Sequence, residues 1–586
     1  MSDAKISTRT SSDFKLRHPL HNSPHTGARL RWLALCIVAA LLLSSCERLN
    51  VSERDKLSRK DEAAAKTANN APAPLVSAMT MPKPESRAAQ EVAKGLIVRR
   101  DGDRVDDREF NTEAYSHIDE NPFFEVARAP LSTFSIDVDT ASYSNTRRFL
   151  KDGQLPPKDA VRIEELINYF SYDYPQPKGD APFSINAEVS ACPWNTKHRL
   201  VHIGLQGKRM LKEDLPPANL VFLLDVSGSM NSPNKLPLVK SSLRMLAEQL
   251  DARDRISIVV YAGSSGLVLP STPGDRRGEI LAALDALEAG GSTNGGEGIQ
   301  LAYRVAAENF IRGGINRVVL ATDGDFNVGV TSEGELVRLI EEKRKSGVFL
   351  SVLGFGTGNV KDATMEKLAD KGNGNYAYID ELQEARKVLG EQLGATLATI
   401  AKDVKIQVEF NPRQAAAYRL IGYENRLLRD QDFNDDTKDA GEIGAGHTVT
   451  ALYEVVPFGQ KFDNPGVDEL KYQKPTEVSA SADMKELMTI KIRYKDPEAS
   501  ASKLLSVWVS DAGGTLESAS NNLKFSSAVA GFGMLLRDSK YKGDVRYTDV
   551  AALARAAAGA DAQGYRTEFI QLVERAQTLS RQRASN

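Results

Sequence analysis

The stretch LVFLLDVSGSM, residues 220–230, joins an apolar run to a polar turn. Residues 220–224 are short and apolar enough for a strand that is buried on both faces of a sheet. Side chains alternate along an extended chain, so the oxygens of Asp225, Ser227 and Ser229 can face one small volume after the strand. Gly228 allows that turn to close tightly. The pattern therefore predicts a metal site directly after a buried strand.

Between about residues 218 and 399, strand-like and helix-like segments alternate. The predicted strands are 220–224, 256–261, 317–321, 349–355 and 376–379. The predicted helices are one with the apolar stripe Val239, Leu243, Leu246 and Leu250, followed by 278–287, 295–310, 333–345, 364–371 and 382–396. Alternation of this kind predicts a doubly wound, mostly parallel α/β sheet, in which ligands bind at the carboxyl ends of the strands.

Two further turns supply oxygen ligands in the order that a complete site requires. The loop GGSTN, residues 290–294, contains Thr293 and precedes a predicted helix, while ATDGD, residues 321–325, contains Asp323 and ends a predicted strand. Each turn alone is also explained by the conformational preferences of Ser, Gly and Asp. Together with Asp225-x-Ser227-x-Ser229, they resemble the metal-ion-dependent adhesion site (MIDAS) of von Willebrand factor type A domains.

This resemblance implies a role for each of the five residues. Ser227, Ser229 and Thr293 would coordinate the ion directly, and Asp225 and Asp323 would hold it partly through water. Hard oxygen ligands select Mg²⁺, Mn²⁺ or Ca²⁺, and Mg²⁺, the ion we expect, commonly keeps some of its waters. An acidic side chain of a protein partner can then replace one water. We expect binding and not enzymatic activity, because no general base or nucleophile set accompanies the motif.

A competing enzymatic interpretation rests on residues 136–141, IDVDTA. They are similar to the D-x-D-x-T motif of haloacid-dehalogenase-type phosphatases, but Ala141 occupies the position of the threonine. The simpler interpretation is the end of a strand followed by a helix that Asp139 or Thr140 caps.

The N-terminal region predicts export and lipid attachment. Arg29 and Arg31 precede the apolar run 32–43, which is too short to span a bilayer, and the residues LSSC at 43–46 resemble a bacterial lipobox. We expect residues 1–45 to form a signal peptide, with an over-long start, and Cys46 to carry the lipid. Residues 46–94, rich in Ala, Pro and Lys, form a flexible linker. By the sorting rule that this resemblance implies, Glu47 favours the outer membrane, facing the periplasm, over the inner membrane.

The remaining segments predict a second domain around the α/β unit. Strand-like runs occur in residues 181–217 and again in 402–512, so we expect a β-sandwich into which the unit 218–399 is inserted. Residues 95–180 form an N-terminal extension with a strand and helices, and residues 513–586 form a helical region. Cys192 is expected to be a small buried side chain at the end of a strand.

The wider architecture resembles a family of bacterial lipoproteins that carry a von Willebrand factor A domain, the YfbK-like family. The runs PLSTFSIDVDTASYS at 130–144, LPP at 155–157 and RIEELINYF at 162–170 carry this resemblance. It extends over nearly all of the predicted folded chain and implies an architecture without naming a substrate.

The composition does not point to nucleic acid and does not by itself name a partner. The 586 residues carry a net charge of −3, so the chain has no excess of basic residues to attract nucleic acid. We expect an envelope lipoprotein that binds a protein partner through its metal ion. The alternative is a structural or assembly factor of an envelope complex, in which the ion mainly stabilises the fold.

Overall fold

The computed structural model describes residues 113–292, 295–324, 333–358, 360–392, 398–438, 440–462 and 478–585. The chain divides into two units, residues 1–106 and 107–586, and the second contains all of the described residues. The predicted signal peptide 1–45, Cys46 and the linker 46–94 lie outside them. In the described ranges, no helix combines the length and the apolar character needed to cross a membrane.

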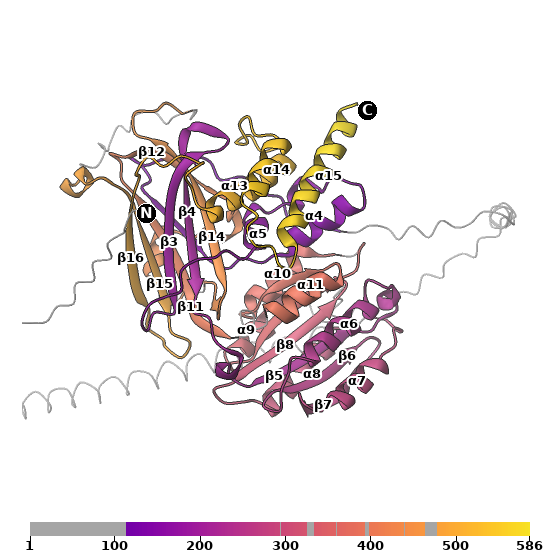
Figure 1. The fold of residues 1–586 in the computed structure, drawn as a ribbon. Coiled ribbons are helices and arrows are strands. Elements are labelled where there is room, and N and C mark those ends of the chain that lie inside the picture. Colours follow the sequence, from indigo (N-terminus) through magenta and orange to yellow (C-terminus); the bar gives the residue numbers. More distant parts are fainter. Residues whose placement is uncertain are drawn as a thin grey trace, which may run out of the picture. The chain divides into compact units, whose positions relative to one another are not determined.

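The central part of the second unit's sequence forms an α/β domain, which is at the lower right in Figure 1. Its strands are β5 (Ala218–Asp225), β6 (Arg255–Tyr261), β7 (Ser265–Pro273), β8 (Ile315–Thr322), β9 (Phe349–Phe355) and β10 (Tyr376–Ile379). Its helices are α6 (Leu236–Ala247), α7 (Arg277–Asp285), α8 (Gly295–Glu308), α9 (Glu333–Arg344), α10 (Asp362–Lys371) and α11 (Leu382–Arg386). The strand order is β10-β9-β8-β5-β6-β7. Neighbouring strands are parallel, except that β7 pairs with β6 in the antiparallel direction.

Both faces of this sheet are covered, which explains why β5 is buried along its whole length. Leu220, Phe222 and Leu224 pack against α6, α7 and α11. Val221 and Leu223 point the other way and pack against α8, α9 and α10. The structure thus confirms the predicted doubly wound α/β fold.

Three details of this domain differ from the prediction. The edge strand β7 was not predicted; Pro270 and Pro273 are tolerated there because an edge strand leaves one side unpaired. The predicted helix 382–396 is instead α11 followed by a short π-helix, η4 (Lys387–Glu391), and residues 393–396 lie outside the described residues. Leu250, assigned to the first helix, is buried beyond the end of α6.

Two antiparallel sheets form the β-sandwich. The first has the order β1-β12-β14-β4-β3, with β1 (Phe124–Glu125), β12 (Ala415–Ile421), β14 (Thr448–Pro457), β4 (Asn195–Gly207) and β3 (Phe183–Cys192). The second has the order β13-β11-β15-β16, with β13 (Ile443–Gly444), β11 (Thr399–Phe410), β15 (Glu486–Lys495) and β16 (Lys503–Ser510), and β2 (Leu131–Ser135) also pairs with β11. Side chains from both sheets share one core, which includes Val201, Ile203, Ile406 and Val408.

The order of these strands along the chain explains how the domains are joined. Strands β3 and β4 precede the α/β domain and β11 to β16 follow it, so the α/β domain is inserted into the sandwich. Residues 95–180 were predicted to form an N-terminal extension with a strand and helices. In the structure this segment contributes two strands, β1 and β2, which pair with β12 and β11 of the sandwich. Cys192 is buried at the end of β3, as predicted.

Five helices form a further layer against the first sheet (Figure 1). They are α4 (Ala141–Lys151), α5 (Ile163–Asn168), α13 (Asn521–Arg537), α14 (Tyr547–Ala556) and α15 (Tyr565–Ser585). Their core includes Leu200, Ile421 and Leu452 from the sheet. The predicted side-chain cap of α4 is wrong: Thr140 forms no capping hydrogen bond, and Asp139 Oδ1 accepts a hydrogen bond from the Tyr376 N–H (2.8 Å).

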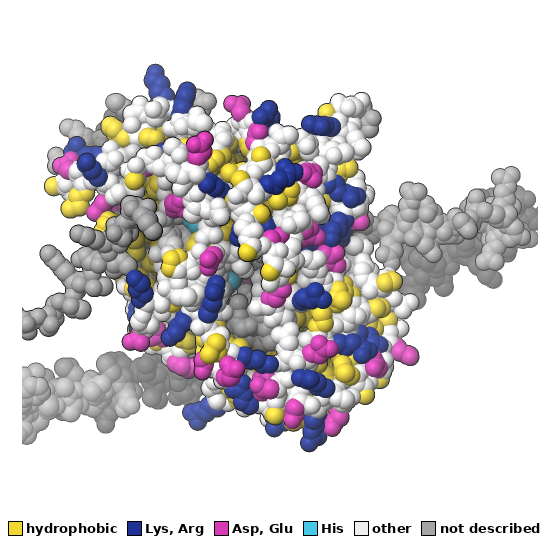
Figure 2. All heavy atoms as spheres, in the orientation of Figure 1, with side chains coloured by type: hydrophobic (Ala, Val, Ile, Leu, Met, Phe, Trp, Pro, Cys, Tyr) yellow, Lys and Arg dark blue, Asp and Glu magenta, His cyan; other side chains and the backbone are white. Residues whose placement is uncertain are grey.

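Acidic and basic side chains are interspersed on the face of the molecule drawn in Figure 2. This mixture agrees with the small net charge of −3. No single sign of charge dominates that face, so it offers no broad electrostatic attraction for a polyanion.

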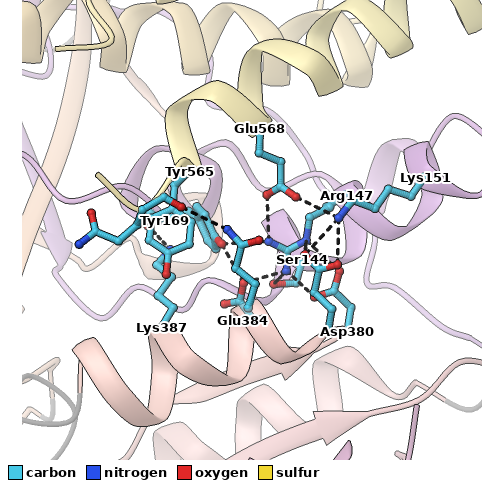
Figure 3. A network of polar contacts seen from close by, with 12 residues as sticks. Ser144, Arg147, Lys151, Tyr169, Asp380, Glu384, Lys387, Tyr565 and Glu568 are labelled. Carbon is cyan, nitrogen blue, oxygen red and sulfur yellow. Dashed lines mark hydrogen bonds and ion pairs between the residues drawn. The ribbon is translucent and has the colours of Figure 1, made fainter. Parts of the chain in front are cut away.

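A buried arginine ties together three parts of the chain that lie far apart in the sequence (Figure 3). Arg147 of α4 has a fully buried side chain and donates to Asp380 before α11 (2.8 Å), to Glu384 in α11 (2.8 Å) and to Glu568 in α15 (3.3 Å). The Tyr169 hydroxyl accepts a further hydrogen bond from Arg147 (3.0 Å). This Arg147 cluster fastens the end of the α/β domain to the helical layer.

A second buried ionic cluster is rich in carboxylates. Two arginines, Arg162 and Arg426, form ion pairs with six acidic side chains: Asp137, Asp139, Glu165, Asp362, Glu366 and Asp370. Four of these six acidic residues are buried and the other two, Asp137 and Asp370, are partly buried. Two guanidinium groups cannot neutralise all six carboxylates, so protonation of some of them is favoured. Burial raises the pKa of Glu165 to about 8, despite the opposing charge of Arg162.

The elevated pKa of Glu165 predicts a specific dependence of stability on pH. The folded chain retains this proton up to about pH 8, whereas the unfolded carboxyl releases it near 4.5, so its stabilising contribution is present at low pH and is lost as pH rises through about 8. We expect the free energy of unfolding of the wild type to fall, relative to Glu165→Gln, by up to about 1.4 kcal/mol per pH unit over this window.

Urea unfolding of both proteins between pH 5 and 9 measures this difference. The glutamine can still accept the hydrogen bond that the Ser142 N–H donates to Glu165 (2.8 Å), so the variant should fold. Parallel profiles for the two proteins would show that Glu165 is ionised in the folded chain.

Candidate metal site

The carboxyl end of β5 carries the first part of the predicted site. Asp225 is the last residue of β5 and is only 1% exposed. Its Oδ1 accepts a hydrogen bond from the Ser227 N–H (2.9 Å), which closes the turn. The hydroxyl oxygens of Ser227 and Ser229 lie 3.1 Å apart, and Ser229 is exposed to solvent. The structure thus brings these three side chains together at the end of the strand.

The Gly-rich loop is bonded directly to this turn. The Gly290 N–H donates to Val226 O (2.7 Å), and the Gly228 N–H donates to Gly291 O (3.1 Å). Gly291 has a φ of +84°, which a residue with a side chain rarely adopts. Thr293, the predicted ligand that follows this loop, lies outside the described residues.

The neighbouring strand β8 brings Asp323 to the same end of the sheet. Thr322 ends β8, and its hydroxyl lies 3.5 Å from Asp225 Oδ2. Burial raises the pKa of Asp225 to about 6, and the negative charge of Asp323 acts in the same direction. The two carboxylates are therefore close enough to influence each other.

Two residues at the site were not predicted. The Tyr261 hydroxyl, from the end of β6, donates to Asp225 Oδ2 (3.1 Å), and the buried Lys235 ammonium donates to Asp323 Oδ2 (3.0 Å). The Lys235 side chain reaches Asp323 by lying against Gly356, where any Cβ would collide with it. Neither residue belongs to a spacing pattern. The register of the parallel strands β5 and β6 pairs Tyr261 with Asp225, whereas Lys235 precedes α6 and no pattern in the sequence places it at the site.

The donor set fits a hard divalent cation. Two ligands at adjacent corners of an octahedral Mg²⁺ site, each about 2.0–2.1 Å from the ion, lie about 2.9 Å apart. The separation of 3.1 Å between the Ser227 and Ser229 hydroxyls is close to this value. In the described ranges, no group of three or more His, Cys, Asp or Glu side chains is placed to hold a metal ion.

The net charge of the site also matters for what it can bind. With Asp225 and Asp323 ionised and Lys235 protonated, the described residues contribute a charge of −1. A bound divalent ion would make the local charge +1, which favours an additional anionic ligand.

Comparison with known proteins places these features in a family. Residues 219–391 match the model of the von Willebrand factor type A domain, residues 109–202 match a model described as von Willebrand factor, and residues 395–579 match the C-terminal model of the uncharacterized protein YfbK. The Escherichia coli (strain K12) protein YfbK is 46% identical over 471 residues, which cover 79% of this chain and 81% of that protein.

Two more distant similarities cover a smaller share of this chain or correspond to a weaker superposition of the two structures. The E3 ubiquitin-protein ligase WAV3 of Arabidopsis thaliana is 24% identical over 284 residues, covering 45% of this chain and 36% of that protein. The solved structure of a von Willebrand factor type A protein from Catenulispora acidiphila is 15% identical, covers 65% of this chain and 88% of that chain, and has a TM-score of 0.35.

The fold and the matched models define a protein with a von Willebrand factor type A domain inserted into a β-sandwich. Such domains typically mediate protein interactions. The chain belongs to the YfbK family.

Proposed function

We propose that this protein is a lipid-anchored component of the bacterial cell envelope that binds a protein partner through a divalent ion. The ion is Mg²⁺, with Mn²⁺ and Ca²⁺ as alternatives, and it is held by Asp225, Ser227, Ser229, Thr293 and Asp323. The observation that carries the proposal is the meeting of the serine hydroxyls, Asp225 and Asp323 at the carboxyl end of β5 and β8.

The partner presents a carboxylate to the ion. The described residues supply two carboxylates and one ammonium, so an ion bound among them retains a net positive charge. Ser229 is exposed, so the site is accessible from solvent. An acidic side chain that replaces a metal-bound water would both neutralise this charge and complete the coordination shell.

The polar groups around the ion serve binding and not catalysis. Asp225 is engaged by Ser227, Tyr261 and Thr322, and Asp323 is engaged by Lys235. A general base needs an oxygen or nitrogen that is available for the proton of a substrate or a water. These groups are committed to each other, which argues against hydrolysis at the site.

The anchor and the location are part of the same proposal. Cys46 carries the lipid, residues 46–94 serve as the linker between this anchor and the rest of the chain, and Glu47 directs the protein to the outer membrane, facing the periplasm. The proposal does not include nucleic acid as a partner, because the net charge is −3 and acidic and basic side chains are mixed on the face drawn in Figure 2.

Capture of partners from envelope extracts tests the proposal. We expect the tagged full chain to retain a defined set of proteins in Mg²⁺ and to release it when EDTA removes the ion. Thermal melts in Mg²⁺, Mn²⁺ and Ca²⁺ identify the preferred ion, because an ion that binds only the folded chain raises its melting temperature.

The alternative function is bracing of an envelope complex, in which the ion stabilises the fold. The burial of Asp225 and Asp323 favours this role, since an ion among them would strengthen the core of the domain. A strong rise of the melting temperature in Mg²⁺ without any EDTA-sensitive partner would support bracing. A partner set that EDTA leaves unchanged would refute metal-dependent capture.

A further inference from the structure

The α/β domain and the rest of the described chain have separate hydrophobic cores. Two core clusters of the α/β domain lie on the two faces of its sheet, and the sandwich and the helical layer have core clusters of their own. Among the described residues, Ala141 of α4 is the one residue from outside the α/β domain in either of its two clusters. Burial of apolar surface therefore contributes much less to the contact between these modules than to the interior of each.

Ion pairs hold this contact, and their charges are divided by module. Asp362, Glu366 and Asp370 recur every four residues in α10, so they share one face of that helix. Arg162 of α5 pairs with Glu366 (2.7 Å), and Arg426, from the loop after β12, pairs with Asp370 (2.6 Å). The α/β domain thus contributes acids to this contact, and the rest of the chain contributes the arginines.

The Arg162/Arg426 cluster contains more acids than these pairs require. Asp137 and Asp139, from the loop before α4, and Glu165 of α5 face the same two arginines. If all six carboxyls of the cluster were ionised, it would carry an excess of four negative charges. The other titratable or charged groups that face these carboxyls are Tyr115, Tyr376, Glu164, Glu424 and Arg537. Glu424 and Arg537 pair with each other (2.6 Å), so these groups add no net positive charge.

Burial and mutual repulsion keep part of this cluster protonated at neutral pH. Burial raises the pKa of Asp137 to about 8, and the charge of Asp370 acts in the same direction, against that of Arg426. Burial also raises the pKa of Asp139 well above its usual range. Carboxyls that separation exposes to water ionise at about pH 4. Separation of the α/β domain therefore releases protons, so a rise in pH up to about 8 favours the separated form.

We propose that the Arg162/Arg426 cluster is a pH-sensitive latch, which holds the α/β domain against α5 and the sandwich while its carboxyls are partly protonated and releases the domain when they ionise. The released domain stays attached, because it is inserted between β4 and β11. Clefts of about 430 and 670 Å³ lie between the α/β domain and its neighbours, so the contact is not closely packed. The latch does not depend on metal binding.

A thiol at Ala141 reports the release. Ala141 is 1% exposed and packs into the core of the α/β domain, so Ala141→Cys in the full chain should react with iodoacetamide only when the domain separates. The labelling of the parent chain is subtracted, and the rate is divided by that of the same variant unfolded in urea at the same pH. We expect the normalised rate to rise by roughly tenfold per pH unit between about pH 6 and 8.

A second buried thiol separates release from unfolding of the whole chain. Ala306 of α8 is fully buried in the same core but belongs to the α/β domain itself. The normalised rate of Ala306→Cys should change much less over the same pH range. An equal pH dependence of Ala141→Cys and Ala306→Cys would show global unfolding and overturn the latch, as would a rate at Ala141→Cys that does not change with pH.

Neutral substitutions test whether the cluster is responsible. In the Ala141→Cys background, Asp137→Asn with Glu165→Gln removes two carboxyls that retain protons only in the closed form, so the normalised rate should rise by less than about tenfold over the whole range. The control replaces two exposed acids, Asp549→Asn with Glu574→Gln, and should keep the full dependence. A full dependence in the variant of the cluster would overturn its assignment as the latch.

Hydrogen exchange of the wild type gives a measurement that needs no substitution. The Tyr376 N–H donates to Asp139 Oδ1 (2.8 Å) across the contact, so release frees this amide. After correction for the base catalysis of exchange, peptides that contain this amide should lose protection between about pH 6 and 8, while peptides of β5 keep it. Unchanged protection at Tyr376 relative to β5 would also overturn the latch.

Discussion

Replacing Asp225 with alanine is expected to abolish metal-dependent partner capture. Asp225 lies at the centre of the site, where it orients Ser227 through the backbone N–H and accepts the Tyr261 hydroxyl. Loss of a residue that orients metal ligands lowers metal affinity by roughly 10–100-fold. We expect Asp225→Ala to retain in Mg²⁺ only those proteins that the wild type retains in EDTA, while secretion and lipid attachment continue.

Asparagine at the same position separates metal binding from folding. Alanine leaves the Ser227 N–H and the Tyr261 hydroxyl without their acceptor, which costs about 1–3 kcal/mol of stability. Asparagine retains an oxygen for the Ser227 N–H, and its amide can donate to the Tyr261 hydroxyl. Asp225→Asn should therefore melt near the wild-type temperature without metal, yet gain little stability from added Mg²⁺.

An exposed acid of the same domain provides the control. The Asp285 side chain is 56% exposed at the end of α7 and pairs with Arg244 on the surface. Asp285→Asn removes the same charge, so it should keep both the Mg²⁺ response and the captured proteins. Equal capture by wild type and Asp225→Asn in Mg²⁺ would exclude the metal site as the binding surface.

The central strands could be predicted because each contains a short apolar run that is recognisable in the sequence. The run 220–224 has no polar interruption, and such a run is stable only where both faces of a sheet are covered. Because parallel strands end on the same side, the positions of Asp225 and Asp323 followed from the strand pattern alone. The edge strand β7 has no comparable apolar run, since Pro270 interrupts it and only two of its nine residues are buried.

Contacts that depend on the tertiary fold could not be predicted. Lys235 precedes α6 and looks like an ordinary surface lysine in the sequence, yet it is 2% exposed and bonded to Asp323. The helix predicted for 382–396 has suitable residues for one continuous helix, but the structure changes from α to π geometry at Lys387. There the Lys387 ammonium donates to the Tyr169 carbonyl of another module, a contact that no local propensity reveals.

Replacing Arg147 with methionine is expected to cause the largest loss of stability. The side chain of Arg147 is fully buried, and the variant would leave Asp380 and Glu384 without their guanidinium partner and Glu568 with only its ion pair to Lys151 (3.0 Å). Removal of one partner from a buried ionic cluster costs about 3–5 kcal/mol. Urea unfolding should therefore show a large drop in the midpoint for Arg147→Met.

An exposed ion pair gives the contrasting case. Arg546 is 75% exposed and pairs with Asp549 at the start of α14, so Arg546→Met should leave the urea midpoint close to that of the wild type. If Arg147→Met is as mild as this control, solvent must already screen the Arg147 cluster.

Neutralising the carboxylates tests whether charge is the cause. The triple variant Arg147→Met, Asp380→Asn, Glu384→Gln removes the arginine together with the carboxylates of α11 and its preceding loop that pair with it. We expect this variant to recover much of the lost stability, because the penalty in Arg147→Met comes mainly from unpaired negative charge. If the triple variant is no more stable than Arg147→Met, the loss of stability comes instead from the packing of the arginine side chain, which contacts α11 and α15 from its position in α4.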